Sequence, residues 1–270
     1  MREVFVCSIN QQQHKGVTEP YVATLCDGEE TFLAFIKTKD NPQGDRCLIN
    51  ELISYRLAKE LDILMPVSGV AIINNETQDN TGSFELLNNT GSCFFSKQIY
   101  KANNLSKSTM YYIDNKDCYE KIMLFDHLIY NSDRNPGNII LPFKKGKKLL
   151  YTIDHTHVFK NQCIWDANSL RLGIKENDYL DTRIVEDNSS VYDLFLSDKH
   201  ITKNSLFVVA DEFLKKCSKK VVEYVLKDLP KDWLISQEEL IALRDYILYR
   251  ASHLKDMCQV IAKQKGLENE

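Results

Sequence analysis

Residues 131–138, which read NSDRNPGN, combine side chains whose types and spacing could perform chemistry. The segment lies between two apolar runs, IMLFDHLIY and IILPF. Asn, Ser, Asp, Pro and Gly all favour turns, so a surface loop between two buried elements is the simplest interpretation. However, Asp133 and Asn138 are five residues apart, and the cationic Arg134 lies between them. A carboxylate and an amide at this spacing could do more than turn the chain.

The segment that follows should bring a second carboxylate to the loop. IILPF, KKGKK and LLYTID read as strand, turn at Gly146 and strand, which is a hairpin. In an antiparallel pair the start of one strand lies beside the end of the other, so Asn138 and Asp154 should be neighbours. Their oxygens suit a hard cation such as magnesium. Asp133, on the other side of that cation, could accept a hydroxyl proton while the metal holds phosphates.

This spacing is also that of a kinase catalytic loop. Protein kinases use D-x-x-x-x-N in that loop, and the metal-binding Asp of D-F-G follows it. Asp133, Asn138 and Asp154 occupy these places in order. The spacing alone is weak evidence, but the hairpin and the sequence IDHTHVF strengthen it. We therefore predict phosphoryl transfer from ATP.

The first part of the chain offers the lysine and the glutamate that a kinase needs. TFLAFIK places Lys37 at the end of an apolar strand, and NELISYRLAKEL places Glu51 in the first turn of the next helix. In kinases such a lysine holds the α- and β-phosphates and the glutamate holds the lysine, so we expect the two within ~3–4 Å. The alternatives are a solvated strand-end lysine and an acidic residue favoured by the helix dipole.

The hydrophobic pattern predicts an α+β protein. Residues 1–100 should form a small, mainly antiparallel sheet with one helix, and the polar stretch NETQDNTGSFELLNNTGS should be an exposed loop. Residues 101–270 should be mainly helical after the hairpin. Before the strand of Lys37, HKGVTEPY could cover phosphates through Gly16, Val17 and Thr18, although it is not G-x-G-x-x-G.

Composition excludes several other classes of protein. The net charge of −4 and the pI of about 5.9 argue against direct nucleic-acid binding. No signal-peptide core and no run of 18 apolar residues occurs, so we expect no membrane span and a cytoplasmic location. The eight cysteines are scattered singly, which favours reduced thiols over zinc sites or disulfides. His155 and His157 could share a face and bind metal, but a hydrogen-bonded structural role is favoured.

The order of GVTEPY, FIK, INELISYRLAKEL, NSDRNPGN and YTIDHTHVF resembles that of the HipA-like kinases. The loop is also similar to that of phosphatidylinositol-kinase-like enzymes, which read N-x-D-R-x-x-x-N and I-D. The resemblance covers residues 14–160 by motif and the helical remainder by general architecture. It implies a two-lobed protein-kinase-like fold with an N-lobe over residues 1–100 and a C-lobe over residues 101–270.

The resemblance also implies a role for each matching residue. Asp133 resembles the catalytic base, while Asn138 and Asp154 resemble the magnesium ligands. Lys37 would be the ATP lysine and Glu51 its partner. Gly16, Val17 and Thr18 would lie over the phosphates, and the backbone of residues 96–100 would carry the adenine. The chain departs from both relatives at Asn135, where they usually have histidine.

The function that the resemblance implies is an ATP- and Mg²⁺-dependent serine/threonine kinase acting on a protein, as toxin-like HipA enzymes do. An antitoxin-like partner is a further expectation from the resemblance. A lipid or small-molecule hydroxyl as the acceptor, or nucleotidyl transfer with the same residues, remain alternatives. So does a nucleotide-binding pseudokinase or interaction module, which Asn135 and the plain glycine turn favour.

Overall fold

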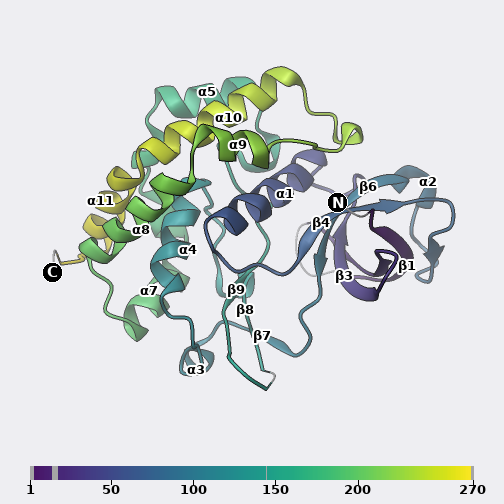
Figure 1. Ribbon diagram of the computed structural model, residues 1–270, viewed down its shortest axis with the longest axis horizontal. Helices are drawn as coiled ribbons and strands as arrows, with labels where there is room; N and C mark the ends of the chain where they lie inside the picture. The colour runs from purple at the N-terminus through teal and green to yellow at the C-terminus, as the bar shows by residue number, and fades with distance from the viewer. Residues whose placement is uncertain (1–2, 14–17, 144, 269–270) are drawn as a thin grey trace.

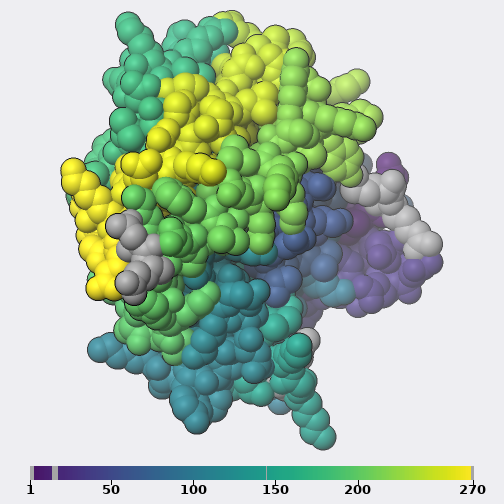
Figure 2. Space-filling view, turned by 60° about the vertical axis from the view of Figure 1, so that its left-hand side comes forward, coloured from purple at the N-terminus to yellow at the C-terminus, as the bar shows by residue number. Residues whose placement is uncertain are grey.

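The computed structural model describes residues 3–13, 18–143 and 145–268. Figure 1 shows a strand-rich part on one side of the molecule and a larger body of helices on the other. In Figure 2 the strand-rich part projects from the side of the helical body. Each part has its own group of buried apolar side chains. The predicted mixed α+β architecture is therefore confirmed.

The strand-rich part is a closed barrel with one extra strand. Its strands follow the order β2-β3-β6-β4-β1-β5, and β1 also pairs with β2, which closes five of them into a ring. Their bounds are β1 (Phe5–Gln12), β2 (Tyr21–Cys26), β3 (Thr31–Lys37), β4 (Ser68–Ile73), β5 (Gln78–Asp79) and β6 (Gly91–Lys97). The pairing is mainly antiparallel, as predicted, but the prediction did not include the closure of the sheet into a barrel or the parallel pairing of β1 with β4 and β5.

Irregular pairing of β1 explains how the barrel closes. The register between β1 and β2 shifts between Val6 and Ser8 and again between Ile9 and Gln11. Such bulges bend a strand and increase its twist. The bent β1 can therefore pair with β2 along its length and with β4 at Phe5.

The polar stretch between β4 and β6 is more ordered than its composition predicts. It contains β5 and the short helix α2 (Leu86–Asn89), so it is not a plain loop, although most of its residues are exposed as predicted. Phe84 explains this order because its ring is buried against Tyr21, with 5.0 Å between ring centroids. Phe84 thus helps to fix a segment that is rich in Asn, Thr and Gly, together with the hydrogen bond from the buried Thr77 hydroxyl to the Val6 carbonyl.

The helix α1 (Asp45–Glu60) links the two parts. It begins in the chain directly after β3, yet its buried side chains belong to the apolar core of the helical body. Figure 1 shows it between the barrel and the helices. Any residue on α1 that faces the barrel is therefore held in place by the larger core.

The helical body begins with a small three-stranded sheet in the order β7-β8-β9. Its strands are β7 (Ala102–Asn104), β8 (Ile139–Pro142) and β9 (Tyr151–Thr152). The pairing of Ile139 with Thr152 confirms the predicted hairpin. The helices are α3 (Lys107–Met110), α4 (Cys118–Leu128), α5 (Ala167–Lys175), α6 (Arg183–Asp187), α7 (Ser189–Asp198), α8 (Lys203–Lys216), α9 (Lys219–Val225), α10 (Gln237–Ser252) and α11 (Leu254–Lys265). Short 3₁₀ turns are η1 (Pro136–Asn138), η2 (Gln162–Ile164), η3 (Asp178–Leu180) and η4 (Lys231–Trp233).

Within the described residues, every helix is too short or too polar to cross a lipid bilayer.

The position of α1 gives a first prediction. Leu57→Ala removes a fully buried side chain from α1 and should lower the free energy of unfolding by ~2–5 kcal/mol, since a cavity remains. Leu87→Ala, at a leucine that is 88% exposed, should change it by less than ~0.5 kcal/mol. Denaturant unfolding of the two variants checks this, and equal losses would contradict the placement of α1 in the core.

Candidate active site

Lys37 and Glu51 meet in the interior between the barrel and α1. Lys37 is the last residue of β3, and Glu51 lies in the first half of α1. Their exposed fractions are 8% and 2%. The Lys37 Nζ atom donates to Glu51 Oε1 at 2.5 Å. The structure therefore brings into contact the lysine and the glutamate that the sequence paired.

Two further acceptors complete the surroundings of the Lys37 ammonium. Nζ lies 2.8 Å from Asp154 Oδ1 and 2.6 Å from Thr156 Oγ1. An ammonium has three N–H donors, and Glu51, Asp154 and Thr156 supply three acceptors for them. The Thr156 hydroxyl in turn lies close enough to donate to Glu51 or to Asp154. Sequence analysis did not identify Thr156 as part of this site.

The electrostatics of this cluster follow from one cation between two carboxylates. Burial opposes the charge of Lys37, but Asp154 and Glu51 outweigh it and raise the Lys37 pKa above its usual value. Burial likewise acts to raise the pKa of Asp154, and the nearby Lys37 charge lowers it well below the ordinary range. For Glu51 burial prevails, and its pKa is raised. Asp154 is thus ionised, and its side chain, which is 39% exposed, lies at the edge of the site.

The helix α1 also fixes the backbone that follows β9. The His155 amide donates to Glu51 Oε2 at 3.1 Å, and the Asn50 side chain donates to the Thr156 carbonyl at 2.7 Å. The indole of Trp165 donates to the other end of the Asn50 amide at 2.8 Å. Asp154 therefore sits on a segment anchored on both sides, although its own φ of 56° lies in the left-handed region.

Arg134 is not exposed on the surface of the loop. Its side chain is fully buried and pairs with the fully buried Asp126 of α4, with Arg134 Nη2 2.9 Å from Asp126 Oδ1. Nη1 donates to the carbonyls of Asn138 at 2.9 Å and Ile153 at 3.2 Å. One guanidinium thus ties α4 to both ends of the β8–β9 hairpin. The buried Arg134 side chain therefore stabilises the loop from the protein interior.

His155 is part of the same buried support. Its Nε2 atom lies 2.7 Å from Arg134 Nη2. Because a guanidinium can only donate, Nε2 accepts, and the neutral ring carries its proton on Nδ1. Burial and the Arg134 charge lower the pKa of His155 well below its usual value, which keeps the ring neutral. No group of three or more His, Cys, Asp or Glu suited to a metal occurs among the described residues.

Asp133 is held by three side chains. Asn135 Nδ2 donates to Asp133 Oδ1 at 3.1 Å, and His157 Nδ1 lies 3.3 Å from Asp133 Oδ2. Asn138 Nδ2 donates to the Asp133 carbonyl at 2.7 Å. The Asp133 side chain is nevertheless 41% exposed, so a hydroxyl from solution can reach it. Asn135 thus orients the carboxylate, and His157, for which sequence analysis favoured a structural role, contacts it directly.

Asn138 and Asp154 lie at adjoining positions, as the hairpin predicts. The Ile153 amide donates to the Asn138 carbonyl at 3.0 Å. Asn138 uses its amide nitrogen toward Asp133, so its amide oxygen is the atom that could face a cation. An amide oxygen and an ionised carboxylate fit magnesium, whose remaining ligands would be water and phosphate oxygens. The donors present thus fit the implied ion.

The turn that the sequence predicts to cover phosphates can be described only in part. Gly16 and Val17 lie outside the described residues. Thr18 is buried, with 5% of its surface exposed, and the Gln13 amide donates to the Pro20 carbonyl at 2.8 Å, which closes the turn between β1 and β2.

A model of the HipA-like kinases matches residues 6–259. The chain belongs to the HipA-like kinase family. No curated protein matches the sequence. This HipA-like kinase is similar in fold to the Helicobacter pylori proinflammatory kinase CtkA, at 15% identity, a TM-score of 0.59 and 98% coverage of each chain. A chain of the Shewanella oneidensis MR-1 complex of HipA, HipB and operator DNA is less similar, at 11% identity and a TM-score of 0.43, with 96% of this chain and 66% of that chain covered.

The buried pair beneath the loop of this HipA-like kinase gives a second prediction. Asp126→Ala leaves the Arg134 charge buried without its partner and should lower the free energy of unfolding by ~3–5 kcal/mol. Glu238→Ala breaks an exposed pair with Arg171, whose members are 66% and 50% exposed, and should change it by less than ~1 kcal/mol. Denaturant unfolding measures both, and similar small losses would show that the Asp126–Arg134 pair does not support the loop.

The contact between His157 and Asp133 predicts a pH dependence of stability. The hydrogen bond to Asp133 raises the pKa of His157 above its usual value, against the effect of burial. The stabilisation is therefore complete below the unfolded-state pKa of ~6.5 and is lost as pH rises through the higher folded-state pKa. The melting temperature of the unmodified protein should exceed that of His157→Gln by more at pH 5.5 than at pH 9.

Asp133→Asn provides the control for this titration. Without the Asp133 carboxylate, the pKa of His157 followed by NMR should fall back toward its ordinary value. An unchanged pKa in Asp133→Asn would mean that Asp133 is not the partner that raises it.

Proposed function

We propose that this HipA-like kinase is an ATP- and Mg²⁺-dependent enzyme that transfers the γ-phosphoryl group to a serine or threonine hydroxyl of a protein. The observation that carries the proposal is the joining of Lys37 to both Glu51 and Asp154 at 2.5 and 2.8 Å, between β3, α1 and the end of the hairpin. A buried ammonium flanked by an ionised carboxylate, beside a loop that presents Asp133, is an arrangement suited to holding phosphates.

Each residue of the site has a distinct task in this proposal. Lys37 binds the α- and β-phosphates, and Glu51 keeps its ammonium in position. Asp133 accepts the proton of the attacking hydroxyl, and Asn135 and His157 hold its carboxylate in orientation. Asn138 and Asp154 would hold magnesium, which supplies charge neutralisation for the phosphates when bound. The buried Thr156 hydroxyl accepts a further hydrogen bond from the Lys37 ammonium.

The proposal commits to a protein hydroxyl as the acceptor of the phosphoryl group. The fold of this chain is similar to that of CtkA, which is described as a kinase. An antitoxin-like partner stays a prediction of the family resemblance.

Three variants test the proposed assignment. Asp133→Asn should abolish transfer and leave nucleotide affinity unchanged, because Asp133 acts on the acceptor. Asp154→Ala should weaken magnesium–nucleotide binding as well as transfer, and Asn138→Ala should do the same more mildly, because a neutral amide holds a cation less strongly. Transfer from labelled ATP, nucleotide affinity and thermal melting are measured together for each variant.

A pseudokinase gives a different pattern in the same experiment. It would bind nucleotide with Asp154-dependent affinity and transfer no phosphate. If well-folded Asp133→Asn protein transferred phosphate at the normal rate, Asp133 would be only a turn residue and the proposed mechanism would be wrong.

A further inference from the structure

Three surface hollows follow one another on the helical body. The first, which we call the loop hollow, has a volume of about 390 Å³ and is lined by Ser132, Lys160, Ile164 and Arg183 among others. The second, the middle hollow, measures about 290 Å³ and lies around Lys160, Leu180 and Arg183. The third, the α11 hollow, measures about 300 Å³. Each is large enough for one or two side chains.

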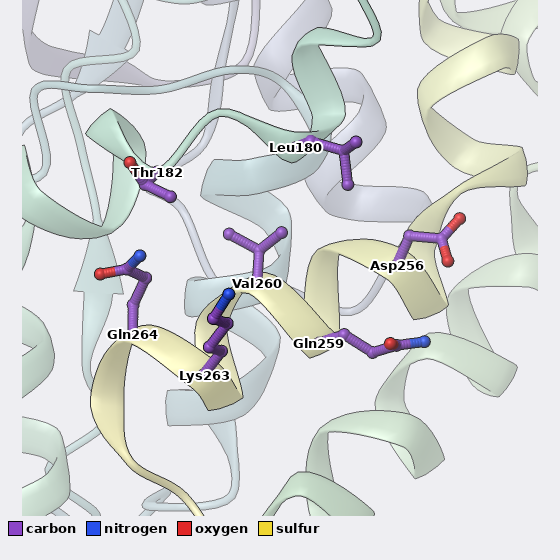
Figure 3. Close-up of a pocket in the computed structure, with 7 residues that line it drawn as sticks. All are labelled: Leu180, Thr182, Asp256, Gln259, Val260, Lys263 and Gln264. Atoms are coloured by element: carbon purple, nitrogen blue, oxygen red, sulfur yellow. The ribbon is translucent and has the colours of Figure 1, made fainter.

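Shared lining residues show that the hollows are neighbours. Lys160 and Arg183 line both the loop hollow and the middle hollow, and Leu180 lines both the middle hollow and the α11 hollow. Figure 3 shows the last of these, with Leu180 and Thr182 on one side and Val260 on α11 on the other. The row therefore runs from the loop to the last helix, a shape that suits an extended chain.

The loop hollow adjoins the candidate catalytic base. Ser132, which directly precedes Asp133, lines it, and Gln162 Nε2 lies 3.4 Å from Ser132 Oγ. Consecutive Cα atoms are about 3.8 Å apart, so the edge of the hollow formed by Ser132 lies next to the backbone of Asp133. A side chain in the loop hollow and a hydroxyl at Asp133 can thus belong to the same acceptor.

The charges of the row disfavour an anionic ligand. Lys160 is paired with Glu176 at 3.0 Å, and Arg183 is paired with Asp181 at 2.5 Å. Carboxylates also outnumber cations among the lining residues, which include Glu176, Asp178, Asp181, Asp187 and Asp256 against Lys160, Arg183 and Lys263. A phosphorylated lipid headgroup needs uncompensated Lys or Arg. The row instead fits neutral or basic side chains.

Uncovered apolar surface lies within the row. Ile164 in the loop hollow is 82% exposed, and Leu180, shared by the other two hollows, is 50% exposed. The wall of the loop hollow also contains three non-glycine residues in the left-handed region, Tyr130, Asn161 and Gln162, with φ of 55°, 66° and 55°. Strain of this kind persists where the surroundings impose it, often at ligand-binding surfaces.

We propose that this row binds an extended segment of the protein acceptor, with an apolar side chain next to the phosphorylated hydroxyl seated on Ile164. The inference rests on the proposed function and adds the chemistry of the acceptor: a polypeptide that is apolar beside the accepting residue and carries no acidic residue there. Peptides with this pattern are selected over lipid headgroups because the row offers apolar contact and more carboxylates than cations.

A positional library of serine- and threonine-containing peptides, with labelled ATP and magnesium, tests the inference. The unmodified protein should prefer an apolar residue at one position beside the acceptor and reject Asp and Glu there. Ile164→Asp should lower kcat/KM for the preferred peptide by about tenfold or more, since one apolar contact discriminates by ~10–200-fold. It should also shift the preference at that position toward Lys and Arg.

Two controls separate this inference from the proposed function. Val208→Asp changes a β-branched side chain that is 60% exposed on α8, outside all three hollows, and should leave peptide selection unchanged. The KM for ATP and the turnover of ATP without peptide should be the same in all three proteins. These two readouts test the kinase assignment alone.

Several results would overturn the inference. The first is that the peptide library shows no positional selection. The second is that Ile164→Asp and Val208→Asp have equal effects on peptide phosphorylation. The third is that phosphatidylinositol vesicles are phosphorylated in place of peptides. In the first two cases Asp133-dependent transfer to peptides would leave the proposed function standing, whereas phosphorylation of vesicles would also contradict its protein acceptor. If ATP were neither bound nor consumed, both the kinase proposal and this inference would fall.

Discussion

One buried ammonium holds the candidate site together. Lys37 comes from the barrel, Glu51 from the helix that joins the larger core, and Asp154 and Thr156 from the segment after the hairpin. A cation removed from water must be paired, so each of these elements is constrained by the same charge. The barrel and the helical body are therefore joined at this point by a buried charge as well as by apolar packing.

A second buried cation has the corresponding role beneath the loop. Arg134 fixes both ends of the hairpin through the carbonyls of Asn138 and Ile153 and leaves Asp133 on the surface. The adjacent residues of the loop thus have opposite tasks: the arginine is buried to give rigidity, and the aspartate is exposed to meet a ligand. His155 and His157 divide in the same way, with His155 in the interior and His157 against Asp133.

Much of the site could be predicted because its decisive contacts are local or repeat a simple pattern. Antiparallel pairing across a short turn places Asn138 beside Asp154, and a strand followed by a helix places Lys37 near Glu51. The burial of Arg134 was missed, although a signal existed in Asp126, a carboxylate inside the apolar run IMLFDHLIY. A buried acid of this kind requires a cation, and Arg134 lies only eight residues further along.

The closed barrel could not be predicted from alternation alone. The parallel pairing of β1 with β4 and β5 depends on bulges between Val6 and Gln11, and a period-two pattern does not specify a bulge. The role of Thr156 likewise could not be predicted from the sequence, because a threonine near an aspartate forms no recognisable motif. Its role arises only when the chain brings Glu51, Asp154 and Lys37 to the same point.

The ammonium of Lys37 has no donor left over. Its three N–H groups face Glu51, Asp154 and Thr156, so a phosphate oxygen that binds it must take the place of one of them. Asp154 is the partner most open to solvent, and it is also the carboxylate suited to a divalent cation. If Asp154 turns to a cation, it releases a donor of Lys37 for the nucleotide. Metal and nucleotide occupancy then become linked equilibria, in which each ligand raises the affinity of the site for the other.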